Sequence, residues 1–566
     1  MFNLPFFASL LSLSLFTRVL TSPTPPYPQG ICSHDATDRA CWGQYSLTTD
    51  YYEEFPETGE TREYWFNIEN TTMAPDGRER VVLAVNGSVP GPTIIANWGD
   101  TIVIHVTNKL ADNGTSLHFH GIRQLNTNYM DGPTSITQCP IAPGDTFTYR
   151  WVASQYGSSW YHAHFGVQTW EGVFGGIIIN GPATANYDED KGTMILSDWS
   201  QTTSNVFSLE AQRTGPPQFD SGLINGTNVF NGQGSRFRTK FVAGTSYRLR
   251  IVNAAADTHY RFTIDDHIMT VISSDFIPIE PFNTTNLSIG MGQRYDVIVY
   301  TKKETKGNFW MRAIPQLACS NHGNIDNIRG IIEYVSDSDS DKDSHSDQNP
   351  PIEPTTNAYP TIDSCDDEDM KLIVPRLSIP ASPNVSQFHH KNATLQQLGP
   401  NRLAWAINNS SFASYWDYPS IQQFDEGNNT WAREQNLVEL PEKDKWIYFL
   451  ITTNFNTSHP MHFHGHDFWV LAAGHGDYTD NVQLQLENSP RRDVAMLPAL
   501  GYLVLAIVTD NPGIWLAHCH IAWHAEEGFA MQLLERESEM REIKGLYDRT
   551  EIEATCKNWR AYTESR

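Results

Sequence analysis

The sequence predicts an all-β protein made of several domains, with short helices and a helical C-terminal tail. Short runs of branched and aromatic residues, such as 81–85 and 101–106, recur along the chain, and turn-forming pairs such as Asn86-Gly87 and Pro143-Gly144 separate them. Strands of this length at this spacing favour a β-sandwich or barrel. A chain of 566 residues that is 40% hydrophobic exceeds one ordinary core, so its length favours three or four domains.

The N-terminus carries an apolar run at residues 6–16 that is too short to span a bilayer, followed by a proline-rich stretch at 22–28. This pattern predicts a secretory signal peptide over residues 1–22; its basic segment is poor, and a buried or interfacial N-terminus is the alternative. Nothing further along resembles a membrane span, so we expect a soluble protein secreted to the cell wall or the medium. About a dozen Asn-x-Ser/Thr sequons fit glycosylation on that route. They include Asn70, Asn86, Asn113, Asn225, Asn392 and Asn456.

The formal net charge of −26 argues against two classes of partner. A nucleic acid or an anionic membrane would be repelled by a surface of the same sign. The charge favours solubility and would enrich cationic or neutral small molecules around the protein.

The chain has seven cysteines, and in a secreted protein an odd number indicates that one thiol stays unpaired. We predict that this thiol is Cys519, which has histidines on both sides. The other cysteines can form three disulfides in an oxidising compartment. They are Cys32, Cys41, Cys139, Cys319, Cys365 and Cys556. The short loop between Cys32 and Cys41 is the easiest to close, and the remaining pairing is open.

The strand-like runs fall into three sets. The first domain is predicted over residues 30–182 and the second over 183–335, where the run at 247–252 alternates apolar and polar side chains. The second domain has no histidine pair. Further runs lie at 176–179, 194–196 and 295–299.

An acidic, serine-rich segment that ends in prolines predicts a loosely ordered linker over residues 336–365. The third domain is predicted over 366–566. Its run at 502–508 is apolar without a break, which indicates a strand covered on both faces. From about residue 532 the chain is dense in Glu, Arg and Lys, a composition that favours a solvated helical tail.

The stretch with the most specific chemistry is His518-Cys519-His520, with His524 four residues further on. One thiolate with two imidazoles is the donor set of a blue electron-transfer copper. If the residues from 514 to 520 form a strand, Cys519 points to one face while His518 and His520 point to the other. The cysteine would then bind one metal site and its two neighbours a second site.

The His-x-His pattern occurs in three further places, at His118/His120, His162/His164 and His462/His464. Twenty histidines in this length of chain would give about one such pair by chance, so four are informative. This spacing on a strand places both imidazoles on one face. Two pairs lie in the first domain and two in the third, which predicts a metal cluster between these domains.

Copper and zinc are the candidate metals, because both bind cysteine and histidine. Eight paired histidines exceed what one tetrahedral zinc ion can use, and a lone thiolate between imidazoles suits electron transfer better. We therefore favour copper.

Four segments resemble the copper signatures of multicopper oxidases, and more closely those of ascomycete laccases. They are His118-Phe119-His120-Gly121, Trp160-Tyr161-His162-Ala163-His164, residues 459–466 and residues 518–529. The resemblance covers nearly the whole chain. It implies three cupredoxin-like Greek-key β-domains and four copper ions, one of type 1, one of type 2 and two of type 3.

The resemblance also implies a ligand for each position. The type 1 copper would bind His459, Cys519 and His524. The type 2 copper would bind His118 and His462. The two type 3 coppers would bind His120, His162 and His520, and His164, His464 and His518, respectively.

By the same resemblance two carboxylates have catalytic roles. Asp131 matches the acid near the type 2 copper that supplies protons to O2. Asp257 matches the acid that accepts the proton of a phenol while His524 takes the electron. An ordinary structural aspartate is the alternative at both positions.

Phe529 matches the axial position of the type 1 site, where a ring without a donor atom should raise the potential. Met531 is a less suitable axial ligand, and His466 and His105 are expected to be structural. The sequence departs from the laccase pattern at Phe119, where tryptophan is usual, and in its C-terminal end Thr563-Glu564-Ser565-Arg566, which lacks the processed tail of several ascomycete laccases.

The implied activity is one-electron oxidation of phenolic small molecules coupled to the reduction of O2 to water by a monomeric enzyme. Three alternatives remain: a dedicated phenol-coupling oxidase of pigment or secondary-metabolite synthesis, a metal-ion oxidase, and a copper-storage protein without turnover. A metal-ion oxidase would need an acidic site beside His524. Oxygen uptake with a phenol would exclude storage.

Overall fold

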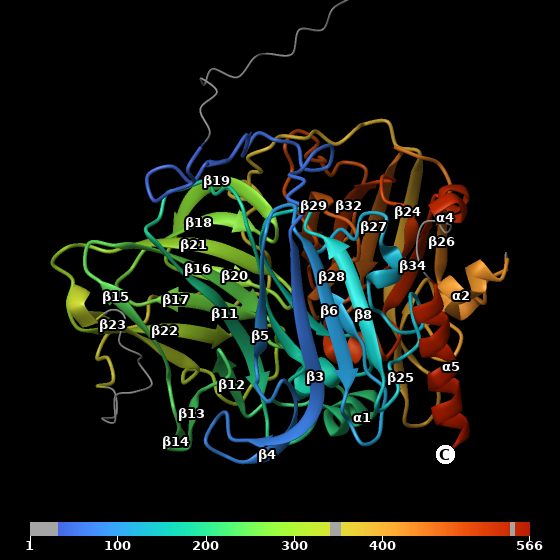
Figure 1. Cartoon of the computed structure of the whole chain (residues 1–566), viewed down its shortest axis with the longest axis horizontal. Coiled ribbons are helices and arrows are strands. Elements are labelled where there is room, and N and C mark those ends of the chain that lie inside the picture. The colour runs from blue at the N-terminus through green and yellow to red at the C-terminus, as the bar shows by residue number, and fades with distance from the viewer. Residues whose placement is uncertain (1–31, 340–351, 429, 544–548) are drawn as a thin grey trace, which may run out of the picture.

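The computed structural model of the chain describes residues 32–339, 352–428, 430–543 and 549–566. Within them, three groups of β-sheets follow one another along the sequence. Figure 1 shows the second group, in green, on the left and the third, in orange and red, on the right. The predicted all-β class is confirmed. The predicted signal peptide at 1–22 lies outside the described residues.

The first group consists of two four-stranded sheets. Their strands, in spatial order, are β4 (Arg80–Val85), β3 (Thr61–Met73), β6 (Thr101–Asn108) and β8 (Thr146–Val152), and then β5 (Gly91–Asn97), β10 (Phe174–Asn180), β9 (Gly157–Ala163) and β7 (Leu117–Phe119). A small hairpin of β1 (Cys41–Trp42) and β2 (Tyr45–Ser46) precedes them. Buried and exposed residues alternate where β3 crosses the core, so one face of this strand packs inward.

The second group pairs a six-stranded with a five-stranded sheet. The strands of the larger sheet are β12 (Ser221–Ile224), β11 (Glu189–Trp199), β16 (Ser246–Asn253), β21 (Arg294–Tyr300), β18 (Met269–Ser274) and β19 (Ile277–Thr284). Those of the smaller sheet are β15 (Phe237–Val242), β23 (Arg329–Val335), β22 (Asn308–Pro315), β17 (Tyr260–Ile264) and β20 (Leu287–Ile289). A short hairpin joins β13 (Val229–Phe230) to β14 (Gln233–Gly234).

The third group repeats this plan. Its larger sheet contains β25 (Leu403–Ile407), β24 (Gln387–Gln397), β27 (Trp446–Thr453), β32 (Gly501–Val508), β29 (Phe468–His475) and β30 (Arg491–Arg492). Its smaller sheet contains β26 (Leu437–Leu440), β34 (Ala530–Glu535), β33 (Gly513–Cys519), β28 (His459–Phe463) and β31 (Val494–Leu497). As predicted, β32 is covered on both faces: Leu503 and Leu505 pack in the main core, and Val504 and Ala506 pack in a second cluster.

Helices are short and lie between or beyond the strands. They are α1 (Ser204–Thr214), α2 (Ser420–Asp425), α3 (Ala522–Glu526), α4 (Glu537–Ile543) and α5 (Thr550–Glu564), with 3-10 turns η1 (Asn128–Met130), η2 (Gln168–Glu171), η3 (Asp337–Asp339) and η4 (Arg433–Gln435).

The predicted helical tail exists, but it begins later and is less solvated than the composition indicated. Residues from Ala530 to Glu535 form a buried strand between β26 and β33. Further on, α5 buries Cys556 and Trp559, and a disulfide joins Cys556 to Cys139 of the first domain. The charged side chains lie on the outer face of this helix, whose other face packs on the protein.

The predicted linker is irregular but not loose where the structure describes it. The hydroxyl of Thr356 donates to Asp265 (2.8 Å), Arg312 donates to the carbonyl of Thr356 (3.1 Å), and Cys365 forms a disulfide with Cys319. This part of the segment is therefore fixed to the second group of sheets. Residues 340–351 lie outside the described part.

Among the described residues, every helix is too short or too polar to cross a lipid bilayer.

Candidate metal centres

The first centre joins two histidines and the free cysteine. His459 begins β28, Cys519 ends β33, and α3 brings His524 back toward them. The Sγ atom of Cys519 lies 3.9 Å from Nδ1 of His459 and 3.6 Å from Nδ1 of His524, and the two nitrogens are 3.1 Å apart. One sulfur and two nitrogens therefore face a common point, which is the donor set predicted for a blue copper.

Burial keeps all three groups neutral in the absence of a metal. It raises the pKa of the Cys519 thiol, lowers the pKa of His459 to about 3 and lowers the pKa of His524 well below its usual value. The imidazoles thus keep lone pairs to donate, and a bound metal ion would deprotonate the thiol. This chemistry fits copper.

Aromatic rings close this centre on its apolar side. Phe529 lies 5.2 Å from the ring of His459, measured between centroids, and offers no donor atom. Met531 lies opposite Ala517 in the β33–β34 ladder, further along the strand than Phe529, whose carbonyl accepts from the amide of Cys519. Trp405 was not predicted. Its ring lies 4.5 Å from His524 and 4.8 Å from His459.

The second centre is built from eight histidines at two pairs of neighbouring strands. His118 of β7 lies opposite His162 of β9, and His462 of β28 lies opposite His518 of β33. The other four follow directly after these strands. They are His120, His164, His464 and His520.

The two strand pairs face each other, so the first and third groups of sheets meet at this cluster. The ring centroids of His118 and His464 are 3.9 Å apart, and those of His120 and His462 are also 3.9 Å apart. Three groups have ligand atoms within 4.8 Å of one another: His118, His120 and His462; His120, His162 and His520; and His164, His464 and His518. The predicted alternation along β33 is present, because Cys519 belongs to one centre and its two neighbours to the other.

Hydrogen bonds orient the histidines of the cluster from behind. Nδ1 of His118 donates to the carbonyl of Asp131 (2.8 Å), and Nδ1 of His462 donates to that of Asp493 (2.7 Å). Nδ1 of His162 lies 3.0 Å from the carbonyl of Ala163. The Nε2 atoms of these three histidines are buried without a partner. Bare lone pairs turned inward are the arrangement that metal ligands require, and backbone or carboxylate partners on the other nitrogen are usual for such ligands.

Asp131, which the resemblance places near the type 2 copper, lies between histidines of the first and third groups of sheets. Its Oδ2 accepts from Nδ1 of His464 (2.8 Å), and its Oδ1 lies 3.2 Å from Nδ1 of His118. The side chain is fully buried. The side chain therefore holds His464, while the backbone carbonyl of Asp131 holds His118.

A second buried aspartate, Asp493, was missed by the sequence analysis. Its Oδ1 lies 3.2 Å from Nε2 of His120, and Arg294 donates to both of its oxygens. Burial raises the pKa of Asp493 to about 7, although Arg294 opposes the shift. The only local signal was the charged run Arg491-Arg492-Asp493 in an apolar context.

Asp257 lies beside α3, next to the first centre. Its Oδ2 accepts from Nε1 of Trp523 (3.1 Å), the neighbour of His524. Burial raises the pKa of Asp257 to about 8, and the charge of Asp198 contributes. Asp198 was not predicted; it accepts from the amides of Ala256 (2.7 Å) and Asp257 (3.1 Å) and so fixes the loop that carries Asp257.

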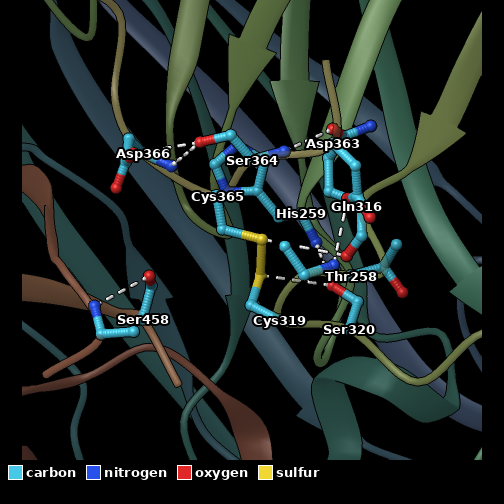
Figure 2. Close-up of a disulfide and its surroundings, with 12 residues drawn as sticks. Thr258, His259, Gln316, Cys319, Ser320, Asp363, Ser364, Cys365, Asp366 and Ser458 are labelled. Atoms are coloured by element: carbon cyan, nitrogen blue, oxygen red, sulfur yellow. Dashed lines mark hydrogen bonds between the residues drawn. A yellow bond between two sulfur atoms is a disulfide. The ribbon is translucent and has the colours of Figure 1, made fainter. Parts of the chain in front are cut away.

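The loop that carries Asp257 is bound at its C-terminal end to a turn that contains a disulfide. Figure 2 shows the bridge between Cys319 and Cys365 beside Thr258 and His259. The amide of His259 donates to the hydroxyl of Ser320 (3.0 Å), and its carbonyl accepts from the amide of Gln316 (2.9 Å). The bridge thus fixes the turn on which the Asp257 loop is supported.

The predicted disulfide inventory is confirmed. The bridges are Cys32–Cys41, Cys139–Cys556 and Cys319–Cys365, and Cys519 is free and buried. His466 and His105 have the structural role expected: His466 bonds to Glu535 (2.8 Å) and His105 to Glu63 (2.8 Å).

A cavity of about 380 Å³ reaches the histidine cluster from the surface. Its inner wall includes His162, His164, His518 and His520, and the exposed side chains Trp416 and Glu526 line its outer part. A small molecule could approach the cluster by this route without passing the first centre.

Comparison with known proteins agrees with this geometry. Three family models, each described as multicopper oxidase, match residues 67–184, 190–336 and 387–539. Laccase-1 of Botryotinia fuckeliana is 43% identical over 568 residues, which cover 99% of this chain and 97% of the relative. Oxidoreductase OpS5 of Beauveria bassiana is 45% identical over 554 residues, or 94% of this chain and 91% of the relative.

Further likenesses come from another relative and from solved structures. Dihydrogeodin oxidase of Aspergillus terreus is 34% identical over 595 residues, covering 97% of this chain and 95% of the relative. The crystal structure of the laccase from Botrytis aclada has a TM-score of 0.87 at 42% identity and covers 94% of this chain and 98% of its own. That of Fet3p, described as a multicopper oxidase that functions in iron import, has a TM-score of 0.77 at 26% identity and covers 88% and 95%. The chain therefore belongs to the multicopper oxidases and is a laccase-like member of that family, a copper-dependent oxidoreductase that uses O2.

Proposed function

We propose that this enzyme oxidises phenols and that its copper ligands are divided as the family resemblance implies. His459, Cys519 and His524 bind the type 1 copper, and His118 and His462 bind the type 2 copper. The type 3 pair is bound by His120, His162 and His520, and by His164, His464 and His518. Bound there, copper supplies the one-electron steps that couple oxidation of the donor to reduction of O2 to water.

The observation that supports this proposal most strongly is the position of Cys519. Its sulfur faces His459 and His524, while the next residues on either side belong to the eight-histidine cluster. A continuous covalent path therefore joins the two centres and can conduct electrons. Metal analysis with an absorption spectrum of the purified protein tests the proposal. Four coppers per chain and an intense blue thiolate band are expected, and fewer coppers without that band would contradict it.

The proposed type 1 site would oxidise the donor, and the eight-histidine cluster would reduce O2. His524 is 8% exposed, and Trp523 beside it donates to Asp257, so we propose that the donor gives up its electron at this edge. The cavity at the cluster admits a small molecule such as O2 from another side.

We further propose three domains at 30–182, 183–335 and 366–566, and a secreted monomer without a membrane or nucleic-acid partner. The three disulfides support an oxidising compartment.

Asp257 is proposed to accept the phenolic proton, which predicts a specific pH profile. Its raised pKa of about 8 means that the carboxylate form becomes populated only as the pH rises toward that value. We expect kcat/KM for a phenol, divided by that for ferrocyanide, to increase with pH up to about 8. In Asp257→Asn this ratio should fall about 100-fold or more and lose its pH dependence, because no base remains to take the proton.

Ferrocyanide is the internal control for this experiment, since it gives up an electron without a proton. Dividing by its rate removes the pH dependence of the O2-reducing cluster. An Asp257→Asn enzyme with the native ratio at every pH would exclude this role for Asp257.

Removing the bridge beside the Asp257 loop should affect phenols selectively. The double variant Cys319→Ser with Cys365→Ser leaves the turn at 316–320 less restrained, so the support of the loop is weakened. We expect a loss of about 2–4 kcal/mol in the free energy of unfolding and a lower kcat/KM for phenols than for ferrocyanide.

The matched control is Cys139→Ser with Cys556→Ser, which opens a bridge of longer sequence separation away from that loop. It should cost at least as much stability without a selective effect on phenols. Equal losses for both donors in the 319/365 variant would show that the bridge does not support the substrate side.

A second candidate function is the coupling of one particular phenolic intermediate, which the likeness to dihydrogeodin oxidase favours. Rates with simple methoxyphenols and with polyketide phenols distinguish the two. A strong preference for the latter would indicate a biosynthetic enzyme.

A further inference from the structure

We propose that the second domain takes part in the trinuclear centre through Arg294, a positioning residue that fixes Asp493 against His120 and His462. The inference rests on the ligand sets proposed above. It is unexpected from the sequence, because this domain contributes no histidine to the cluster.

Arg294 makes a bidentate ion pair with Asp493. It begins β21, is fully buried, and donates from Nη1 to Oδ1 (2.5 Å) and from Nη2 to Oδ2 (2.6 Å) of Asp493. A bidentate pair of this kind fixes the rotation of the carboxylate as well as its position.

The arginine is itself held in place. Its Nε donates to the carbonyl of Ser158 (3.3 Å), and Nη1 donates to that of Gly292 (3.3 Å). Asp275 lies 3.5 Å from Nη1 and also accepts from Nε of Arg492 (3.1 Å). These contacts leave the guanidinium little freedom, so Asp493 is held by a rigid support.

Asp493 passes this restraint to two histidines from different domains. Its Oδ1 lies 3.2 Å from Nε2 of His120 in the first domain. Its carbonyl accepts from Nδ1 of His462 in the third domain (2.7 Å). The two rings stack at 3.9 Å, so a shift of Asp493 would turn one ring against the other.

The backbone of the second domain also forms part of the wall of the cluster. Gly292 adopts a φ of 85°, and a Cβ atom there would lie 3.1 Å from Cε1 of His120 and 3.1 Å from Cδ2 of His520. Such an approach is tighter than side-chain carbons normally allow. The turn that carries Arg294 therefore lies directly against the ligands, independently of the Asp493 contact.

The experiment compares copper-loaded native protein with Arg294→Lys and Arg294→Met. Lysine keeps the positive charge but cannot make the bidentate hydrogen bonds to both carboxylate oxygens of Asp493. Three readouts are taken: copper per chain, the blue band of the type 1 site, and the near-ultraviolet absorption and EPR signals of the trinuclear site. We expect the blue band to persist in both variants. The copper affinity of the trinuclear site should fall about 10- to 100-fold, and this decrease should be smaller in Arg294→Lys than in Arg294→Met.

Arg312→Met is the matched control. Arg312 is also buried in the second domain and makes a bidentate pair with Asp265 (2.8 and 2.7 Å), with no contact to the histidine cluster. It removes a comparable ion pair, so a general loss of stability would appear in both proteins. The trinuclear signals should be retained in this control and lost in the Arg294 variants.

The possible outcomes distinguish a failure of the proposed copper ligand sets from a failure of the role proposed for Arg294. Native protein without four coppers and a blue band would overturn the proposed ligand sets. If the native protein has both, Arg294→Lys with the trinuclear signals and copper content of Arg312→Met would overturn the role of Arg294. Should Arg294→Met fail to fold, the lysine variant alone decides between these results.

Discussion

Replacement of Cys519 by serine is expected to abolish both the blue colour and turnover with every donor. The hydroxyl is a harder donor than a thiolate and is not ionised in a buried site, so it cannot replace the sulfur at a blue copper. The backbone between His518 and His520 would remain, but the electron would have no entry to it. Absorption of the copper-loaded variant and O2 uptake with a phenol measure the two losses.

The eight-histidine cluster provides the control for this variant. Its ligands point away from the Cys519 side chain, so three coppers and the signals of the trinuclear site should remain. Serine is close to cysteine in size, so the fold around His459 and His524 should persist. Either residual blue absorption or measurable turnover in Cys519→Ser would show that the sulfur is not the entry point.

The two candidate metal centres could be predicted because their histidines and cysteine occur in short, local patterns. On a strand, side chains two residues apart share a face, so each His-x-His pair already indicated a common direction. The same rule separated Cys519 from His518 and His520. Strand pairing then completed the cluster, since His118 lies opposite His162 and His462 opposite His518.

Several residues around the proposed ligands could not be predicted, because each acts across a long sequence separation. Trp405 reaches His524 from another strand of the third domain, Asp198 reaches the Asp257 loop, and Arg294 reaches Asp493. None of these contacts has a period or spacing that a sequence displays. Such residues are identified only when the tertiary structure brings them together.

The prediction of a solvated helical tail from about residue 532 was wrong over β34 for a related reason. The charged composition beyond residue 535 dominated the prediction, while the six residues of β34 are too few to show a period that separates a buried strand from a helix. The pairing of β34 with β26 and β33 decides its conformation. The burial of α5 likewise depends on its disulfide and on contacts with the first domain.

Asp131→Asn is expected to slow the reduction of O2 by about 100- to 10,000-fold, the range over which a positioned acid or base contributes to proton transfer. Asp131 accepts from His464 through one oxygen and approaches His118 through the other. An asparagine has one acceptor oxygen and one donor nitrogen, so one of the two histidines would face a donor in place of an acceptor. The variant also loses the group that can carry a proton toward the cavity.

The two halves of the reaction can be timed separately, which distinguishes this role from a general defect. Without O2, a donor should bleach the blue band of Asp131→Asn at the native rate, because electrons are proposed to enter at His459, Cys519 and His524. Return of the blue colour on adding O2 should be slow. Asp100→Asn is the matched control, since Asp100 is a buried carboxylate of the same domain that pairs with Arg62 (2.9 Å). If both variants recover their colour at the native rate, Asp131 does not serve the O2 side, and slow recovery in both would indicate only a loosened first domain.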